Sequence, residues 1–215
     1  MTKSYASVHE HMHECYRQGK SGPWGRMLEW SARSIFKKAK IAENYKRAKI
    51  LRKILDEKFK AADFDDEQSV HEIGDLHFIL VECHEVITDD LLIISAFETM
   101  AKRRLMGKCY VIHEIENPRD LRSRQRRSPI HARTIKAYED RGESVTFREN
   151  TIGIHLLMQK GYRKRISFPD DLQGGIEIAR KRRNLIHFRI ASFYTVEIEL
   201  LDLVAYLDDF IPVHR

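Results

Sequence analysis

Apolar residues recur at helical spacing over most of the chain. From residue 27 to residue 59 they lie mostly three, four or five positions apart, with lysines and arginines between them. This spacing predicts a long amphipathic helix, kinked or straight, which follows a break at Gly22-Pro23-Trp24. The same criterion predicts a second helix over about 70–81, buried on more than one side, and a third, more apolar helix over about 89–110.

The central part of the chain interrupts this pattern. Residues 117–134 carry six arginines and two prolines among few apolar residues, so an exposed loop or insertion is expected there. Helical spacing returns at about 152–158, and over 176–210 it predicts one long helix or two with a short joint. The pattern as a whole predicts an all-α fold, a helical bundle with a long basic loop or insertion between the helices.

Length and composition fit that fold. The 215 residues, 42% of them hydrophobic, suffice to bury a core. Glycine and proline together number only 15, which disfavours turn-rich sandwiches and low-complexity chains. We expect a helical extension over residues 1–66 and a bundle over residues 67–215, which includes the basic insertion at about 117–150.

The sequence does not point to a membrane or to export. The longest mainly apolar run spans seven residues, 91–97, far short of the roughly 20 that cross a bilayer. The N-terminal residues lack the roughly 7 to 15 apolar positions of a secretory signal. Three widely spaced cysteines, Cys15, Cys83 and Cys109, form no CxxC pair and suit reduced thiols. We therefore expect a cytoplasmic protein with no membrane partner.

The positive charge is concentrated in the middle of the chain. Residues 1–100 carry 15 Lys and Arg against 17 Asp and Glu, residues 101–190 carry 22 against 10, and residues 191–215 carry 1 against 5. A strongly basic stretch attracts polyphosphates by Coulomb forces and counterion release, so RNA is the leading partner. A solvated surface paired with local acids is the alternative. The candidate RNA-binding residues are Arg122, Arg124, Arg126, Arg127, Arg180 and Lys181.

One segment places four cations and an amide just ahead of a histidine: Arg180-Lys181-Arg182-Arg183-Asn184-Leu185-Ile186-His187. Metal-free RNA cleavage needs a group of near-neutral pKa to move protons and a fixed cation beside the phosphorane, and histidine and arginine meet these needs. On one ideal helix Arg183 and His187 share a face, whereas Arg182 lies about 140° away from His187. A basic helix end with a histidine over its last carbonyls is the non-catalytic alternative.

This segment resembles the R-x4-H signature of HEPN-domain proteins, a helical family with many metal-independent RNases of toxin–antitoxin, abortive-infection and CRISPR systems. Arg182 and His187 have that spacing. The family commonly has a polar residue, often Asn, directly after the arginine, whereas here Arg183 follows and Asn184 comes one later. Either Arg182 or Arg183 is therefore the functional arginine. The resemblance covers about residues 68–210.

The resemblance implies a toxin or antiphage-defence effector that acts as a homodimer, with the two motifs meeting across a two-fold axis. It implies products with a 2′,3′-cyclic phosphate and a 5′-hydroxyl, and no metal or other cofactor. An antitoxin or accessory protein is a further expected partner. The candidate catalytic residues are Arg182, Arg183, Asn184, His187 and Glu98.

Glu98 belongs to the catalytic set because residues 91–98 resemble the buried early helix of such domains, where a polar residue approaches the motif. A glutamate in so apolar a segment needs a partner, because an unpaired buried carboxylate is costly. Arg182 or Arg183 is the expected partner. A structural ion pair unrelated to catalysis is the alternative.

The N-terminal segment His9-Glu10-His11-Met12-His13-Glu14-Cys15 contains possible metal ligands. On a helix, the pairs His9/His13 and His11/Cys15 have the spacing that chelates zinc, and the first five residues match HExxH. A metalloprotease needs this pattern on a buried helix with a third ligand, whereas this copy is polar and lies near a terminus that frays. We therefore assign no metal site.

Two functions besides the RNase stay open. One is a non-catalytic helical module that binds RNA or a partner protein through the basic residues 119–133 and 160–189. The other is a structural or antitoxin-like protein whose basic surface docks an acidic protein.

Overall fold

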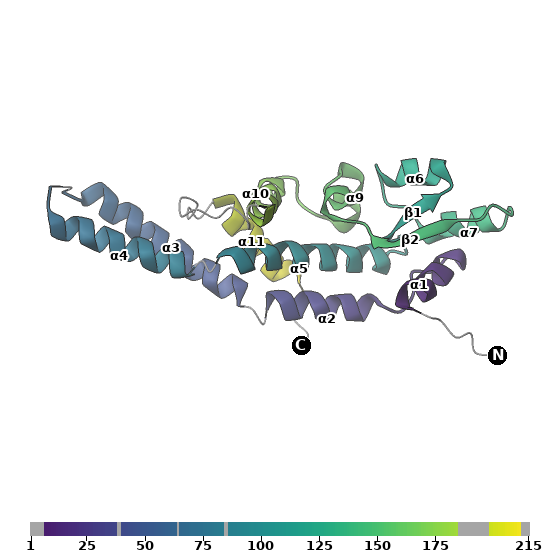
Figure 1. Ribbon diagram of the computed structural model, residues 1–215, viewed down its shortest axis with the longest axis horizontal. Coiled ribbons are helices and arrows are strands. Elements are labelled where there is room, and N and C mark those ends of the chain that lie inside the picture. Colours follow the sequence, from purple (N-terminus) through teal and green to yellow (C-terminus); the bar gives the residue numbers. More distant parts are fainter. Residues whose placement is uncertain (1–6, 38–39, 64, 84–85, 185–197, 212–215) are drawn as a thin grey trace. The chain divides into compact units, whose positions relative to one another are not determined.

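Most of the chain is helical (Figure 1). The structure, a computed structural model, describes residues 7–37, 40–63, 65–83, 86–184 and 198–211. In chain order the elements are α1 (Val8–Arg17), α2 (Gly25–Phe36), α3 (Ile41–Ala61), α4 (Glu67–Cys83), α5 (Val86–Gly107), β1 (His113–Asn117), α6 (Arg119–Gln125), α7 (Ala132–Glu139), β2 (Thr146–Thr151), α8 (Ile154–Leu157), α9 (Lys160–Ile166), α10 (Gln173–Asn184) and α11 (Ile198–Phe210). The predicted all-α class is confirmed, and the two short strands are an addition that the hydrophobic pattern did not predict.

Segments distant in the sequence combine into two compact units. Unit 1 contains residues 1–31 and 98–170, and unit 2 contains residues 32–97 and 171–215. Helices α2 and α5 each contribute residues to both units. This division differs from the expected N-terminal extension followed by a bundle. One reason is that α1 packs against α7 within unit 1, which joins the start of the chain to its middle.

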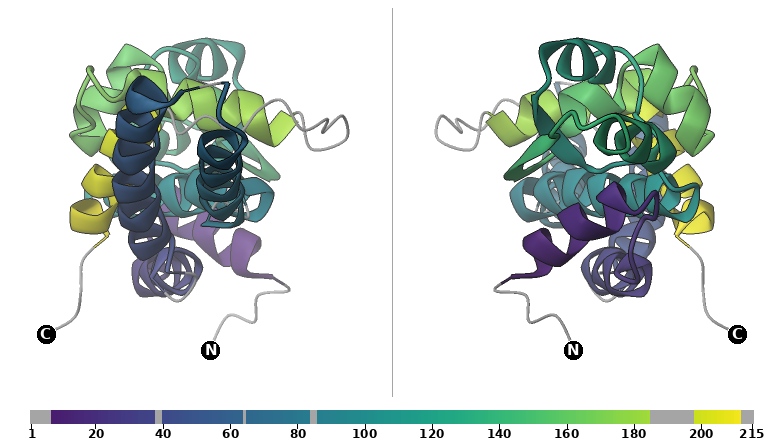
Figure 2. Two further views of the ribbon diagram at one scale, coloured as in Figure 1. Left: turned by 90° about the vertical axis from the view of Figure 1, so that its left-hand side faces the viewer. Right: turned by 90° about the vertical axis from the view of Figure 1, so that its right-hand side faces the viewer.

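In unit 2, α3 and α4 form a helical hairpin. The two helices lie side by side and run in opposite directions (Figures 1 and 2). Helix α3 also contacts α11, and α11 contacts α10. Phe97 of α5 stacks on Phe210 of α11 with ring centroids 6.4 Å apart, and the Lys37 ammonium bonds the Asp208 carboxylate. Apolar contacts and an ion pair thus join segments from both halves of the sequence.

The chain breaks where one long helix was expected. Helix α2 ends at Phe36, Lys40 has a φ of 55°, and α3 begins at Ile41. A residue in the left-handed region does not continue a right-handed helix. The prediction of a single helix over 27–59 is therefore wrong, because the apolar spacing carries across a boundary that only the backbone geometry shows.

Unit 1 contains a two-stranded antiparallel sheet. Strand β1 pairs with β2, with His113 opposite Thr151 and Ile115 opposite Phe147, and α6 packs on β1. The buried side chains of this unit come from most of its elements and include Leu105, Leu121, Ile135 and Tyr162. This core fixes the positions of α6 and of both strands, which carry the basic side chains of the site below.

The basic stretch over residues 117–134 is folded, where an exposed loop was expected. It contains α6 and the start of α7. Leu121 and Gln125 of α6 are buried, as is Ile135 of α7. Leu121 and Gln125 are four residues apart and so share one face of their helix. A helix of two turns needs very few apolar residues to pack against the core. The composition of this stretch, which has few apolar residues, therefore suggested a loop.

Gln125 couples α6 to β1 through both ends of its side-chain amide. Its Nε2 donates to the carbonyl oxygen of His113 at 2.7 Å, and its Oε1 accepts from the N–H of Ile115 at 2.8 Å. Each buried polar group left without a partner costs about 1–3 kcal/mol. We expect Gln125→Ala to lower the free energy of unfolding by about 2 kcal/mol in urea titrations. The control Arg119→Ala, at an exposed position of the same helix, should change it by less than about 0.5 kcal/mol, and equal losses would contradict the coupling.

Helices α10 and α11 end the described chain. They occupy most of the stretch for which one helix, or two with a joint, was expected, and residues 185–197 between them lie outside the described residues. Leu203 and Leu207 of α11 are fully buried. No helix within the described ranges combines the length and the apolar composition that crossing a bilayer demands.

Candidate functional site

The motif that resembles R-x4-H begins at the end of α10. This helix continues to Asn184, so the backbones of Arg182 and Arg183 lie in its last turn. His187 lies outside the described residues. The helical geometry that distinguishes the two arginines thus holds as far as Asn184, and the choice between them stays open.

The two cations ahead of the motif differ in their surroundings. Arg180 Nη2 lies 2.8 Å from Glu177 Oε2, in an ion pair one turn apart on α10, whereas Lys181 is exposed. Arg180 Nε is buried and has no hydrogen-bond partner among the described residues. Of these two RNA-binding candidates, Lys181 is open to a polyanion, while Glu177 partly neutralises Arg180.

Glu98 has its partners within unit 1. Its Oε1 accepts a hydrogen bond from the N–H of Ile154 at 2.9 Å, and its Oε2 lies 3.6 Å from Lys102 Nζ. Ile154 is the first residue of α8, and the first N–H groups of a helix have no partner within it. The carboxylate therefore ties α8 to α5, which gives this glutamate a structural role in an otherwise apolar segment.

Side chains from four elements of unit 1 line a pocket of about 180 Å³. Helix α6 supplies Arg122, and Arg126 caps its C-terminal end. Strand β1 supplies Glu114, β2 supplies Arg148 and α8 supplies His155. Arg148 Nη1 lies 3.7 Å from Glu114 Oε2. Within the described residues, the side chains of Arg122 and Arg126 have neither a hydrogen bond nor an ion pair. Three guanidinium groups against one carboxylate give this arginine pocket a net charge of +2.

The other residues that line the arginine pocket are buried. Ile115, Gln125 and Leu156 complete its lining and are all buried. Both ends of the Gln125 amide are already bonded to β1, so this residue holds the wall in place. The side-chain groups left for a ligand are mainly the guanidinium groups and the imidazole of His155.

The other two candidate RNA-binding arginines between residues 122 and 127, Arg124 and Arg127, lie outside the pocket lining. The Tyr138 hydroxyl donates a hydrogen bond to the Asp120 carboxylate and thereby lowers the pKa of Asp120, with a smaller contribution from Arg124. Arg127 is exposed. The four arginines thus divide: Arg122 and Arg126 converge on a pocket, while Arg124 lies near an acid and Arg127 meets solvent.

Sequence reasoning missed Glu114, Arg148 and His155. They come from two strands and a short helix that the fold brings to α6. The sequence signal that could have found Arg148 is the segment Thr146 to Thr151, if it is interpreted as a strand. Successive side chains of a strand point to opposite faces, so alternate residues of this segment share one face. Its polar composition favoured an insertion over a strand.

A second cluster joins α1 to the sheet. His113 of β1 is fully buried, with its Nε2 2.8 Å from His9 Nδ1 and its Nδ1 3.0 Å from Tyr16 Oη. His13 packs edge-on against His113 with ring centroids 4.5 Å apart and stacks on Phe147 at 4.8 Å. Burial is the main cause that lowers the pKa of His113 to about 3 and that of His13 to about 4. Both imidazoles are therefore neutral at pH 7.

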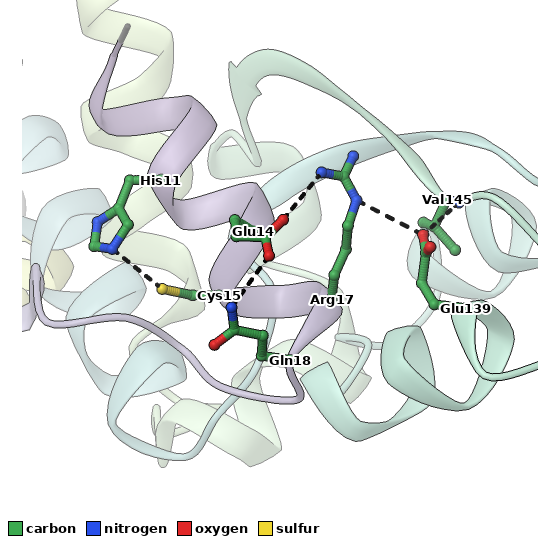
Figure 3. Close-up of polar contacts among 7 residues, drawn as sticks. All are labelled: His11, Glu14, Cys15, Arg17, Gln18, Glu139 and Val145. Atoms are coloured by element: carbon green, nitrogen blue, oxygen red, sulfur yellow. Dashed lines mark hydrogen bonds and ion pairs between the residues drawn. The ribbon is translucent and has the colours of Figure 1, made fainter. Parts of the chain in front are cut away.

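Helix α1 also contacts α7 through an ionic network (Figure 3). Arg17 lies between Glu14 at 3.8 Å and Glu139 of α7 at 3.7 Å. Met12 and Tyr16 of the same helix are buried. The expectation that this segment is polar all round is therefore wrong, because these two residues bury one face of the helix, with Tyr16 against His113 and Phe147 of the sheet.

The two histidine-containing pairs of α1 that have zinc-ligand spacing face different neighbours. His11 Nε2 lies 3.7 Å from Cys15 Sγ (Figure 3), and His11 Nδ1 accepts a hydrogen bond from Trp24 Nε1 at 3.1 Å. His9 and His13 lie against the buried histidine of β1 instead. The described residues contain no group of three or more His, Cys, Asp or Glu side chains able to hold a metal ion.

Comparison with known proteins adds no relative. No family model, no curated protein and no solved structure matches the chain. The chemistry of the arginine pocket, of the motif on α10 and of the histidine cluster therefore follows from their own residues.

Proposed function

We propose that this protein is a metal-independent endoribonuclease of HEPN type, which acts in the cytoplasm as a toxin or antiphage-defence effector. Its composite site consists of Arg182 or Arg183 with Asn184 and His187, assembled in a homodimer. An antitoxin or accessory protein restrains it.

The observation that carries the proposal is the arginine pocket, where Arg122, Arg126 and Arg148 converge. Guanidinium groups match phosphate oxygens in paired hydrogen bonds. Arg122 and Arg126 have no acidic partner among the described residues to compete with a ligand. Because α6 is docked on the core, these side chains are presented with a smaller ordering cost than on a loop. An RNA strand suits these features best.

The motif on α10 supports the cleavage step. Near neutral pH a histidine can take the 2′-hydroxyl proton or protonate the leaving 5′-oxygen, which are the roles of His187. A guanidinium group stabilises the phosphorane, which is the role of Arg182 or Arg183. The backbone of this arginine and of Asn184 belongs to α10.

Incubation of the purified protein with labelled RNA in EDTA tests this function. We expect cleavage that EDTA does not remove, with products that carry a 2′,3′-cyclic phosphate and a 5′-hydroxyl. Cleavage that stops on chelation, or products with other ends, would contradict the mechanism.

A non-catalytic RNA-binding module is the second candidate, because the arginine pocket can hold phosphate whether or not the motif is active. In that case RNA binds the protein and is recovered intact from the same incubation. Binding and cleavage are therefore measured on one RNA.

Removing three exposed arginines should weaken RNA binding in a salt-dependent way. The variant replaces Arg124, Arg126 and Arg127 with Ala, all exposed on or next to α6. We expect the slope of log affinity against log salt to flatten by about two units, at roughly 0.7 per single-strand phosphate contact. Fluorescence-anisotropy titrations around 0.1 M salt measure this slope.

A matched control removes three exposed cations from α3 in unit 2: Arg47, Lys49 and Lys60. Its slope should stay near that of the wild-type protein. An unchanged slope in the arginine variant would instead favour the third function, in which the basic surface docks an acidic protein.

A further inference from the structure

The arginine pocket is small for a site that holds nucleotides. Pockets for drug-sized ligands usually have volumes of about 300–1,000 Å³, whereas this one has about 180 Å³. At roughly 30 Å³ per water molecule in the liquid, that is the volume of about six waters. The pocket thus has room for a phosphate group with its nearest waters, while a base and sugar would lie outside it.

The charge of the pocket distinguishes between two kinds of phosphate. Its three guanidinium groups and Glu114 give a net charge of +2. A phosphodiester within an RNA strand carries one negative charge, whereas a phosphomonoester carries about −1.5 to −2 at pH 7 and has three strong acceptor oxygens. The monoester matches this pocket in charge.

The arrangement of the side chains adds to this match. Arg122 and Arg126 are four residues apart and so lie on one face of α6, and Arg148 comes from β2 on another part of the lining. The carboxylate of Glu114 lies 3.7 Å from Arg148 and holds that guanidinium group, so two of the three cations are left without a local partner among the described residues. Cations that come from separate elements can surround a terminal phosphate, which is bonded to the strand on one side only. A phosphodiester within the strand is bonded to nucleotides on both sides, and these leave less room for cations around it.

We propose that the arginine pocket binds the terminal phosphomonoester of an RNA strand, an inference that rests on the proposed function because it takes RNA as the ligand. Arg122 and Arg126 donate hydrogen bonds to the phosphate oxygens, and Arg148, held by Glu114, supplies the third cation. The proposed cleavage creates a 2′,3′-cyclic phosphate and a 5′-hydroxyl, neither of which is a phosphomonoester. The pocket therefore does not retain the newly made ends.

Binding of three versions of one RNA oligonucleotide tests the proposal: a 5′-phosphate, a 3′-phosphate, and hydroxyls at both ends. The experiment uses the full chain in EDTA with RNA that carries a 2′-O-methyl group at every nucleotide 5′ to a linkage, which prevents cleavage during the titration. We expect one phosphorylated form to bind at least tenfold more tightly than the hydroxyl form, because hydrogen bonds between ionised groups are stronger than those between neutral groups. The two phosphorylated forms distinguish the end that is recognised.

The preference should depend on the pocket arginines. Arg122→Ala and Arg126→Ala should each reduce this preference about tenfold, while Arg122→Lys keeps the charge and loses the paired geometry. Arg119→Ala removes an exposed cation of the same helix outside the pocket and should keep the preference. Circular dichroism shows whether each variant is folded.

The outcomes separate the two proposals. Equal binding of all three RNAs, or a preference that survives both pocket variants, overturns the terminal-phosphate inference and leaves RNA binding intact. A protein that binds none of the RNAs overturns the proposed function, and titration with adenosine 5′-monophosphate against adenosine then tests the pocket by itself. Binding of the monophosphate that Arg122→Ala removes supports the pocket chemistry, and equal failure of both compounds overturns it.

Discussion

His187→Ala is expected to remove RNA cleavage while RNA binding and the free energy of unfolding stay near those of the wild-type protein. A general acid or base typically contributes roughly 10²- to 10⁴-fold in rate, and no other residue of the motif can move a proton near neutral pH. Single-turnover cleavage of a labelled RNA measures the rate, and anisotropy measures binding. A variant that cuts at the wild-type rate would show that His187 is not the proton-transfer group.

The comparison of Arg182→Ala with Arg183→Ala completes this experiment. The family spacing favours Arg182, whereas on an ideal helix Arg183 shares a face with His187, four residues later. A selective loss of cleavage in Arg182→Ala supports the family spacing and action across the two-fold axis. A selective loss in Arg183→Ala supports geometry within one helix, and equal losses indicate one shared electrostatic patch.

The helices of unit 2 could be predicted because each has apolar residues at regular spacing. The expected helices over about 70–81 and 89–110 correspond to α4 and α5, and their ends differ by a few residues. The same criterion failed at Lys40, where the apolar spacing continues although the backbone turns left-handed. The periodicity of apolar residues shows which side chains can share a helix face, and it does not show at which residue a helix ends.

The division into units could not be predicted from order along the chain. Helix α1 packs on α7, more than a hundred residues later in the chain, and only Met12 and Tyr16 of α1 are buried. Contacts of this kind depend on the sheet and on α7 being present. Because the sequence of α1 is mostly polar and its contacts lie far along the chain, the sequence alone suggested that α1 belongs to an N-terminal extension.

Two of the arginines that the sequence singled out line the same pocket. The sequence singled out Arg122 and Arg126 by their charge, and the structure places both at one pocket. Their neighbours Glu114 and Arg148 come from β1 and β2, two strands that pair although α6 and α7 separate them in the sequence. No rule of sequence spacing therefore connects these two residues to Arg122 and Arg126. Charge along the chain indicates the class of ligand, and only the fold shows which charges converge.

The protein is expected to lose stability as the pH falls below about 6.5, and His113 is the main cause. Burial, followed by the charges of His13, His9 and Lys102, lowers the pKa of His113 from 6.5 to about 3. In the unfolded chain this imidazole binds a proton near pH 6.5. Between these two values the unfolded state holds a proton that the folded state does not, so the stability present above pH 6.5 is lost as the pH falls towards 3.

The expected loss from this one group is about 1.4 kcal/mol per pH unit, or about 3 kcal/mol between pH 6 and pH 4. Urea titrations at several pH values measure it, and His113→Phe is the matched control because it keeps a buried ring without a titrating group. In the wild-type structure Tyr16 Oη also accepts a hydrogen bond from the N–H of Ile112 at 3.4 Å, so this hydroxyl does not depend on His113 alone for a partner. Surface carboxylates titrate alike in both proteins, so the difference between the two pH profiles isolates the imidazole. Parallel profiles would mean that His113 accepts a proton while folded, and the cluster that joins α1 to β1 would then open more readily than its burial indicates.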